Sequence, residues 1–196
     1  MADIYVYELD GNLYINLTNR CSNNCEFCVR NKPSYFSYDL RLDKEPSARK
    51  VIKAAGDVSK YKEIVFCGFG EPTYKLRQLL KIGRYFKKKG KYVRLNTNGQ
   101  GNLINGKDIT KELARTTDAV NISLNESCAQ DYQEICESIF GLKAYGEIIK
   151  FADKCKRNGI KTVFSIVDII GSEKIEKCRK IAQETGVELK IRAHIK

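Results

Sequence analysis

The amino-acid sequence predicts an α/β protein, a partial, open TIM-like barrel of six β/α units preceded by an N-terminal hairpin strand. Short apolar strands alternate with amphipathic helices along the chain, which is the pattern of parallel β/α units. The chain has 196 residues, fewer than the roughly 250 of a complete eight-unit barrel. We therefore expect a single domain, residues 1–196, whose barrel does not close.

The elements are predicted in order from local signals. Two β-prone runs, 4–9 and 13–18, are joined by Asp10-Gly11, a two-residue sequence typical of tight hairpins. An irregular loop is expected over 31–43, followed by a helix from about Pro46 to Ala55, because proline suits the first turn of a helix. Later strands are predicted at 63–67, 92–97, 119–125, 161–169 and 188–195, and helices at 73–89, 109–115, 131–137, 144–158 and 173–185.

Alternation along the strands predicts what faces the barrel interior. One side is apolar and should meet the helices, as in Val93 and Leu95, in Val120, Ile122 and Leu124, and in Leu189, Ile191 and Ala193. The other side carries Asn16, Arg94, Asn96, Asn121, Ser123, Asn125, Lys190, Arg192 and His194. Closed barrels fill their interior with branched apolar residues, and polar groups in a dry interior are costly. We therefore predict a hollow, polar interior that holds a ligand.

Three of the eight cysteines lie within residues 21–28, at Cys-x3-Cys-x2-Cys spacing, directly after the second predicted strand. Thiolates at these unequal gaps suit an iron–sulfur cluster. A zinc site would want a fourth ligand, yet His194 is the only histidine and no second Cys-x2-Cys is present. The pattern predicts Cys21, Cys25 and Cys28 as three ligands of a four-iron cluster, which leaves one iron open for chemistry.

A second motif, Gly68-Phe69-Gly70-Glu71-Pro72-Thr73, separates the strand at 63–67 from the next helix. It therefore lies at the carboxyl end of a strand, where βα barrels place their active sites. Glycines allow the backbone to approach a ligand closely, and Glu71 offers a carboxylate to a ligand ammonium group. The alternative is a plain strand-to-helix turn with Pro72 near the first helical position.

Together the motifs resemble the radical S-adenosylmethionine (SAM) superfamily, which has a Cys-x3-Cys-x-aromatic-Cys loop after the first strand and a Gly-Gly-Glu-like motif after the second. The resemblance continues with Asn-Thr-Asn-Gly at 96–99 and Ile-Ser-Leu-Asn at 122–125, and it covers nearly the whole chain. The short length and the lead-in Leu-Thr-Asn-Arg-Cys look like the short radical SAM proteins associated with TatD-type nucleases. Phe69 departs from the pattern, because many relatives carry glycine there.

The resemblance implies a role for each matched residue. Cys21, Cys25 and Cys28 would ligate three irons of a 4Fe-4S cluster, and SAM would chelate the fourth. Cofactor contacts are implied for Phe27 beside the adenine, for Gly68, Phe69, Gly70 and Glu71 at the methionine ammonium, and for Asn96, Thr97, Ser123 and Asn125 at the ribose and methionyl end. The implied reaction is reductive cleavage of SAM to a 5′-deoxyadenosyl radical, with a flavodoxin- or ferredoxin-like protein as the one-electron reductant.

The sequence leaves the substrate open. Lys190, Arg192 and His194 on the last strand indicate an anionic group on the substrate, or pairing with the carboxylate of the cofactor. Cys136 is a further candidate for the substrate side, because it follows the fourth parallel strand. One alternative activity is that of an activase, which generates a glycyl radical on a partner protein.

The charge balance keeps a third class open. The chain has 35 Lys and Arg residues against 24 Asp and Glu, a net charge of +11, which also suits a basic nucleic-acid-binding protein with a structural iron–sulfur cluster. Much of the excess lies at 75–91 on one predicted helix, where a solvated outer face is the alternative explanation. No leader sequence and no run of 18 apolar residues is present, so we expect a cytoplasmic protein without a membrane span.

Overall fold

A seven-stranded sheet in the order β1 to β7 forms the centre of the computed structural model, which describes residues 3–31 and 39–194. Strands β1 (Val6–Leu9) and β2 (Asn12–Ile15) form the antiparallel hairpin. From β2 onward all neighbours are parallel. These strands are β3 (Glu63–Phe66), β4 (Tyr92–Thr97), β5 (Ala119–Ser123), β6 (Lys161–Val167) and β7 (Glu188–Arg192). The predicted open barrel of six parallel strands behind a hairpin strand is confirmed.

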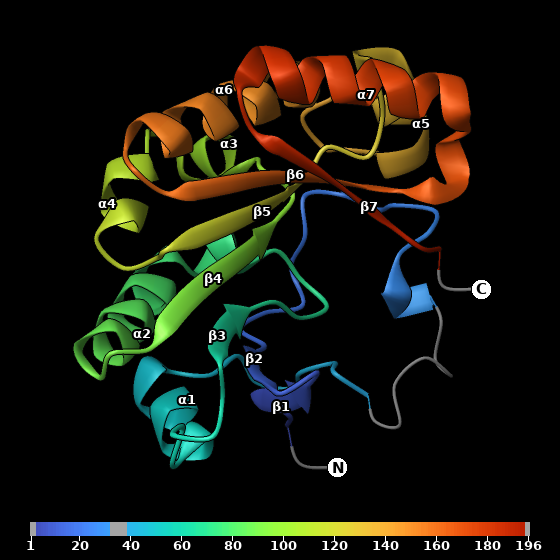
Figure 1. Ribbon diagram of the computed structural model, residues 1–196. Coiled ribbons are helices and arrows are strands. Elements are labelled where there is room, and N and C mark those ends of the chain that lie inside the picture. The colour runs from blue at the N-terminus through green and yellow to red at the C-terminus, as the bar shows by residue number, and fades with distance from the viewer. Residues whose placement is uncertain (1–2, 32–38, 195–196) are drawn as a thin grey trace.

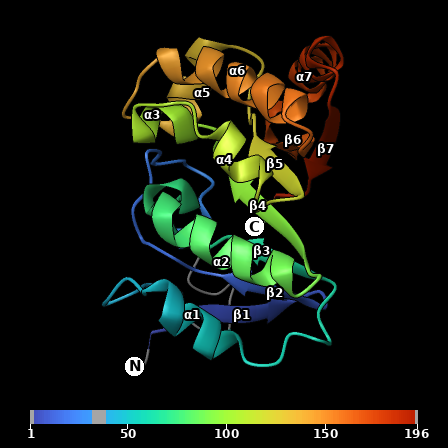
Figure 2. The same cartoon turned by 90° about the vertical axis from the view of Figure 1, so that its left-hand side faces the viewer.

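The helices lie on the outer side of the curved sheet (Figure 1). They are α1 (Ala48–Ala55), α2 (Leu76–Lys88), α3 (Gly101–Asn105), α4 (Thr110–Ala114), α5 (Ala129–Cys136), α6 (Lys143–Arg157) and α7 (Ser172–Thr185). Short 3-10 turns occur at Val29–Asn31, Pro72–Lys75 and Asp168–Ile170. Figure 2 turns the helical side toward the viewer and shows α2, α4 and α6 in front of the strands. In the described part of the chain, no helix has the length and apolarity needed to cross a bilayer.

The hydrophobic core lies between the sheet and this outer layer of helices. Val93, Leu95, Val120 and Ile122 are fully buried, as the alternation predicted. The last strand is an exception, because Ile191 is 37% exposed although the same alternation placed it against the helices. As an edge strand, β7 has a sheet neighbour on one side only, so its outer face is covered incompletely.

Several predicted elements differ from the structure at their ends. The predicted loop at 31–43 falls mostly on residues 32–38, outside the described residues. Helix α3 was not predicted, because its sequence Gly-Asn-Leu-Ile-Asn is flanked by glycines and resembles a loop. Strands β2 and β5 end at Ile15 and Ser123, earlier than expected. Residues beyond these ends do not continue the alternation.

Candidate active site

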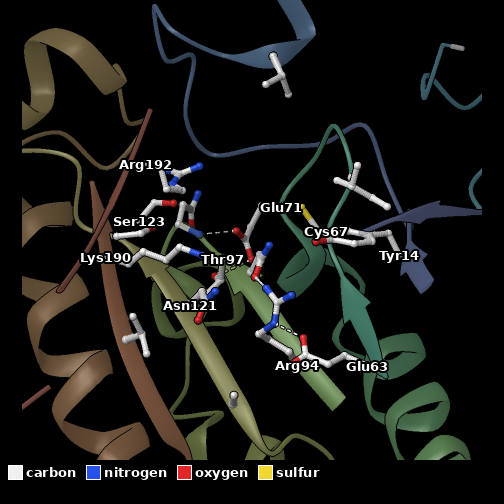
Figure 3. Close-up of a pocket in the computed structure, with 18 of the residues that line it drawn as sticks. Tyr14, Glu63, Cys67, Glu71, Arg94, Thr97, Asn121, Ser123, Lys190 and Arg192 are labelled. Atoms are coloured by element: carbon white, nitrogen blue, oxygen red, sulfur yellow. Dashed lines mark hydrogen bonds and ion pairs between the residues drawn. The ribbon is translucent and has the colours of Figure 1, made fainter. Parts of the chain in front are cut away.

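A hollow of about 1080 Å³ occupies the concave side of the sheet (Figure 3). It runs from the amino ends of the strands, at Tyr92 and Lys161, to their carboxyl ends, where Cys21 and residues 68–71 lie. Most of the predicted interior residues line it, namely Arg94, Asn96, Asn121, Ser123, Lys190, Arg192 and His194. The alternation of polar and apolar residues along the strands therefore predicts this polar cavity correctly.

Asn16 and Asn125 were predicted to face this interior and do not line it. Asn16 is fully buried just beyond β2, where its amide donates to the carbonyl oxygens of Ile4 (3.2 Å) and Leu40 (2.6 Å). Asn125 has a positive φ of 61°, which turns its side chain away from the alternation of β5. Its amide instead donates to Cys136 Sγ at 3.5 Å. Both predictions were wrong because they extended strand geometry past the last strand residue.

The cysteine loop is held by backbone hydrogen bonds to the carboxyl end of α5. Asn24 N donates to the carbonyl oxygen of Cys136 (3.0 Å), and Glu26 N donates to that of Ile135 (3.0 Å). Carbonyl groups at a helix end lack partners within the helix, so they are available to another segment. The carboxyl end of α5 therefore fixes the position of the loop backbone, although more than 100 residues separate the two segments in sequence.

A buried group of polar side chains connects the same two segments. Asn23 Nδ2 donates to the Tyr132 hydroxyl at 2.8 Å, and Gln100 Nε2 donates to Asn23 Oδ1 at 2.8 Å and to the same hydroxyl at 2.9 Å. Ser138 Oγ donates to Gln100 Oε1 at 3.1 Å. None of these residues was predicted as part of the site, because their roles depend on hydrogen bonds between residues far apart in sequence.

All three loop sulfurs accept an N–H hydrogen bond. Cys21 Sγ accepts from the backbone of Asn23 (3.5 Å), Cys25 Sγ from the Asn23 side-chain amide (3.8 Å), and Cys28 Sγ from Arg30 Nε (3.3 Å). Such donors stabilise thiolates and tune iron–sulfur clusters. The donor set therefore fits a cluster with three cysteine ligands. In residues 3–31 and 39–194, no three His, Cys, Asp or Glu side chains converge as a single-ion site.

The surroundings of Cys21 and Cys25 favour the protonated thiols. Burial raises the pKa of Cys21 to about 11. A hydrogen bond shared with Cys136, together with burial, raises the pKa of Cys25. Ligation requires thiolates, so loading of iron must release protons. Cys136 itself is fully buried behind the loop and does not line the hollow, which is a correction to its predicted place on the substrate side.

Gly68 and Gly70 are needed for a close approach between the two motifs. A Cβ atom on Gly70 would lie 2.3 Å from the Thr18 carbonyl oxygen and 2.6 Å from that of Arg20. A Cβ atom on Gly68 would lie 2.1 Å from Asn16 Oδ1. The sequence predicts that the glycines allow a ligand to approach the backbone closely. The structure adds a second reason, because the absence of side chains lets the motif pack against the segment that precedes the cysteine loop.

The Glu71 carboxylate is buried beside the hollow and accepts four hydrogen bonds. Oε1 accepts from Thr73 N (3.0 Å), Thr73 Oγ1 (2.7 Å) and Thr97 Oγ1 (2.9 Å), and Oε2 accepts from Asn98 N (2.8 Å). Burial raises the pKa of Glu71, and the hydrogen bonds lower it part of the way back. With two lone pairs on each oxygen, only Oε2 keeps capacity for a further donor.

The remaining predicted cofactor residues fall into two groups. Phe69, Asn96, Thr97 and Ser123 line the hollow. Phe27 packs against the core, half-buried, and is not among the residues that line the hollow. Cys67 also lines the hollow, although the sequence analysis gave it no role.

Arg94 is engaged within the protein. Its Nε donates to Glu63 Oε2 and its Nη1 to Asn96 Oδ1, both at 2.7 Å. With two such partners, the guanidinium group positions the side chains of Glu63 and Asn96 and does not use these nitrogens to bind a ligand. Figure 3 shows the Arg94–Glu63 pair in the lower part of the hollow, away from Arg192.

Comparison with known proteins gives a consistent family. The model of the radical SAM superfamily matches residues 15–184. A tungsten-containing aldehyde ferredoxin oxidoreductase cofactor-modifying protein of Pyrococcus furiosus is 33% identical over 91 residues, which make up 44% of this chain and 23% of that protein.

Two solved structures show the same fold. Streptococcus suis SuiB bound to the precursor peptide SuiA has a TM-score of 0.71 and 19% identity, over 93% of this chain and 39% of that chain. The structure of anSMEcpe with bound AdoMet has a TM-score of 0.64 and 19% identity, over 93% of this chain and 50% of that chain. The chain thus spans half or less of the length of each relative.

The family model covers the cysteine loop, the glycine motif and strands β3 to β6, and it begins at the last residue of β2. Members of this family use a 4Fe-4S cluster and SAM, and the chemistry of the three sulfurs fits such a cluster. The more specific resemblance to TatD-associated proteins stays a prediction. The chain belongs to the radical SAM superfamily.

Proposed function

We propose that this chain is a radical SAM enzyme that cleaves SAM reductively at a 4Fe-4S cluster ligated by Cys21, Cys25 and Cys28. The observation that carries the proposal is a loop in which each of these thiols accepts from an N–H donor and from which Cys21 lines one end of a polar hollow. When bound, the cluster and SAM supply a one-electron cleavage that yields a 5′-deoxyadenosyl radical for removal of a substrate hydrogen. The reductant would be a flavodoxin- or ferredoxin-like protein.

The chain would contribute binding, orientation and exclusion of water. Glu71 Oε2 can accept one further hydrogen bond, which suits the ammonium group of SAM. That group would lie next to Cys21 at the carboxyl ends of the strands. Asn96, Thr97 and Ser123 would contact the ribose and methionyl parts from the strand ends. Phe27 and Asn125 would support the cofactor from behind the loop, where Asn125 Oδ1 is buried without a hydrogen-bond partner among the described residues.

The size of the hollow leaves room for a substrate beside the cofactor. The Pyrococcus furiosus relative is named as a cofactor-modifying protein, and SuiB was solved with a precursor peptide. A small cofactor precursor and a peptide are therefore the two substrate classes that we propose to test first. A mouth bounded by the unpaired edges β1 and β7 suits either class.

The test is anaerobic reconstitution of the cluster, addition of SAM and dithionite, and quantification of 5′-deoxyadenosine. We expect product from the parent protein and none from Cys25→Ala. A full cluster with bound SAM and no product, in the presence of candidate substrates, would refute the proposal. Cys178→Ala is a matched control, because this thiol is buried on α7, away from the loop.

The same preparation tests the two alternatives. A glycyl-type radical on a co-purified protein would identify an activase instead. Tight RNA or DNA binding that weakens steeply with salt, without cleavage of SAM, would identify a nucleic-acid-binding protein with a structural cluster.

A further inference from the structure

One wall of the hollow carries cationic side chains that have no partner among residues 3–31 and 39–194. Lys190 and Arg192 lie two residues apart on β7, and both line the hollow. Neither side chain forms an ion pair or a hydrogen bond with any described residue, whereas the Arg94 side chain across the hollow is paired with Glu63. Figure 3 shows Lys190 and Arg192 on the same side as Ser123, opposite Cys67 and Tyr14. Unpaired cations in a concave site attract anions.

A hydroxyl on the neighbouring strand can contribute to the same ligand chemistry. Ser165 lines the hollow and is only 5% exposed, and its hydroxyl makes no hydrogen bond to the described residues. Its oxygen is not among the fully buried unpartnered atoms, so the hydroxyl is open to the hollow and free to bond a ligand there. Ser165 and Lys190 are paired neighbours in the β6–β7 register. Their Cβ atoms are therefore only about 5 Å apart.

The acidic residue on β7 limits where along this strand an anion would lie. Glu188 lines the hollow two residues before Lys190, so it would repel an anion from the amino ends of the strands. Arg192 lies two residues after Lys190, roughly 7 Å further along the strand, toward the end that carries the cysteine loop. An anionic group is thus favoured between Ser165, Lys190 and Arg192, on the side of the hollow nearer the cluster.

We infer that Ser165, Lys190 and Arg192 form an oxyanion site that binds a carboxylate or phosphate group of the substrate. The inference rests on the proposed radical SAM activity, because it assigns the substrate of that same hollow. A carboxylate or phosphate oxygen accepts hydrogen bonds from the hydroxyl, the ammonium and the guanidinium groups together. Fixing that group at one end of the substrate would orient the rest of the molecule toward the cysteine loop.

The inference can be tested by binding before a substrate is known. The probes are inorganic phosphate and acetate, titrated separately by calorimetry into the reconstituted protein. We expect saturable one-to-one binding of at least one of them, weakened about tenfold or more by Lys190→Met or Arg192→Met. Ser165→Ala should weaken it by roughly threefold to tenfold. The preferred probe would distinguish a phosphate-bearing substrate from a carboxylate-bearing one.

Lys161→Met is the matched control. Lys161 also lines the hollow and its loss removes the same charge, but it begins β6, four residues before Ser165. Its replacement should change anion affinity by less than about twofold, because roughly 13 Å of strand separate the two positions. An equal loss of anion affinity in Lys161→Met would mean that anion binding depends only on the net charge of the hollow, and the inferred site would then be wrong.

A titration with SAM separates the substrate from the cofactor. In the parent and all four variants, SAM affinity should agree within about threefold, since its carboxylate is expected at the cluster. If Lys190→Met or Arg192→Met weakens SAM binding and leaves the anion probes unaffected, the site belongs to the cofactor and the inference is wrong. If the parent protein binds the anion probes but never yields 5′-deoxyadenosine, the proposed radical SAM activity is wrong and the inferred anion site still stands.

Discussion

At the scale of single residues, Gly70 links the two motifs of the site. Any Cβ atom there would meet the carbonyl oxygens of Thr18 and Arg20, which are backbone atoms and cannot rotate away. We expect Gly70→Ala to destabilise the fold by about 1–3 kcal/mol and to lower iron incorporation. Chemical denaturation and iron analysis measure the two effects. Gly146→Ala in α6 is the control, because nothing lies within 4 Å of its Cβ position and alanine favours helices.

Thr97 is the second residue that supports the motif. Its hydroxyl donates to Glu71 Oε1 and accepts from Gly99 N at 3.0 Å, and the residue is 4% exposed. Thr97→Val keeps the shape but leaves a buried carboxylate and a backbone N–H short of a partner, at a cost of about 1–3 kcal/mol. Urea denaturation checks this. Thr162→Val should cost less, because that buried hydroxyl only donates to the neighbouring Ile160 carbonyl oxygen. Equal costs would contradict the argument.

The role of a residue was predictable where the chemistry of the site requires that residue type. It was not predictable where the role depends on contacts with residues far away in sequence. Cysteine spacing and the Gly-Phe-Gly-Glu motif were sufficient to predict the family. The role of Gln100 was not predictable, because an amide side chain gains its function only from Asn23 and Tyr132, which lie far away in sequence. The prediction for Asn125 was wrong for a local reason, because nothing in the neighbouring sequence indicates a positive φ.

At the scale of elements, α5 orders the cysteine loop through backbone hydrogen bonds at its carboxyl end and through the Tyr132 hydroxyl. Tyr132→Phe would leave the amides of Asn23 and Gln100 without their shared buried acceptor. We expect a loss of about 1–3 kcal/mol in the free energy of unfolding and weaker retention of the cluster. The effect should be constant between pH 6 and 9, because burial raises the pKa of Tyr132 and keeps the phenol neutral.

Tyr145→Phe provides the matched comparison for Tyr132. Tyr145 is also buried on a helix, but its hydroxyl makes a single hydrogen bond, to the Glu126 carbonyl oxygen at 2.9 Å. Its loss leaves one unsatisfied acceptor and lies outside the loop, so cluster retention should be unchanged. Iron and sulfide content after gel filtration distinguishes the two variants. Equal loss of iron from both would show that α5 has no special role.

Asp108 connects two outer helices and gives a prediction with a definite pH window. Its carboxylate accepts from Thr110 N at the start of α4 (3.0 Å) and pairs with Lys154 of α6 (3.0 Å). Burial alone would raise the pKa of Asp108, but hydrogen bonds from Thr110 and Lys154 outweigh it and lower the value to about 2. The ionised form is therefore favoured in the folded state.

The sign of the Asp108 effect follows from linkage. Stabilisation by this carboxylate should be complete above its ordinary pKa of 3.8 and lost as the pH falls toward 2. Asp108→Asn should cost roughly 1 kcal/mol at pH 6, a modest amount because the group is partly exposed. The difference from the parent should shrink at pH 3, as measured by denaturation at both pH values. A difference that grows in acid would contradict the assignment.

At the scale of the whole molecule, the open barrel and its polar hollow were predictable because they depend on repeated patterns. Six alternating units and the polarity of their strands are distributed over the chain, so single errors do not change the result. Side-chain pairing between strands was not predictable, since the ion pair of Arg94 with Glu63 on the neighbouring strand, and the absence of a described partner for the Lys190 side chain, depend on the three-dimensional positions of the strands.

The whole fold should also be stabilised by its cofactors, because the cysteine loop and the rim bring together segments from most of the barrel. The loop contacts α5 at residues 135–136, and Glu71 N donates to the Arg20 carbonyl oxygen at 2.8 Å. A ligand that binds only the folded state at about 100 times its dissociation constant adds about 2.7 kcal/mol. For a domain of this size, that amounts to a rise of roughly 5–11 °C in the melting temperature.

We therefore expect SAM to raise the melting temperature of the cluster-loaded protein by this amount, as measured by anaerobic calorimetry. Cys25→Ala, which lacks one of the three iron ligands, should show a rise of less than about 2 °C, because SAM would lose its chelating iron. An equal rise in both proteins would mean that SAM binds without the cluster, and the ligand arrangement proposed for Cys21, Cys25 and Cys28 would then be wrong. Lys161→Met should respond like the parent, since its charge lies at the far end of the hollow.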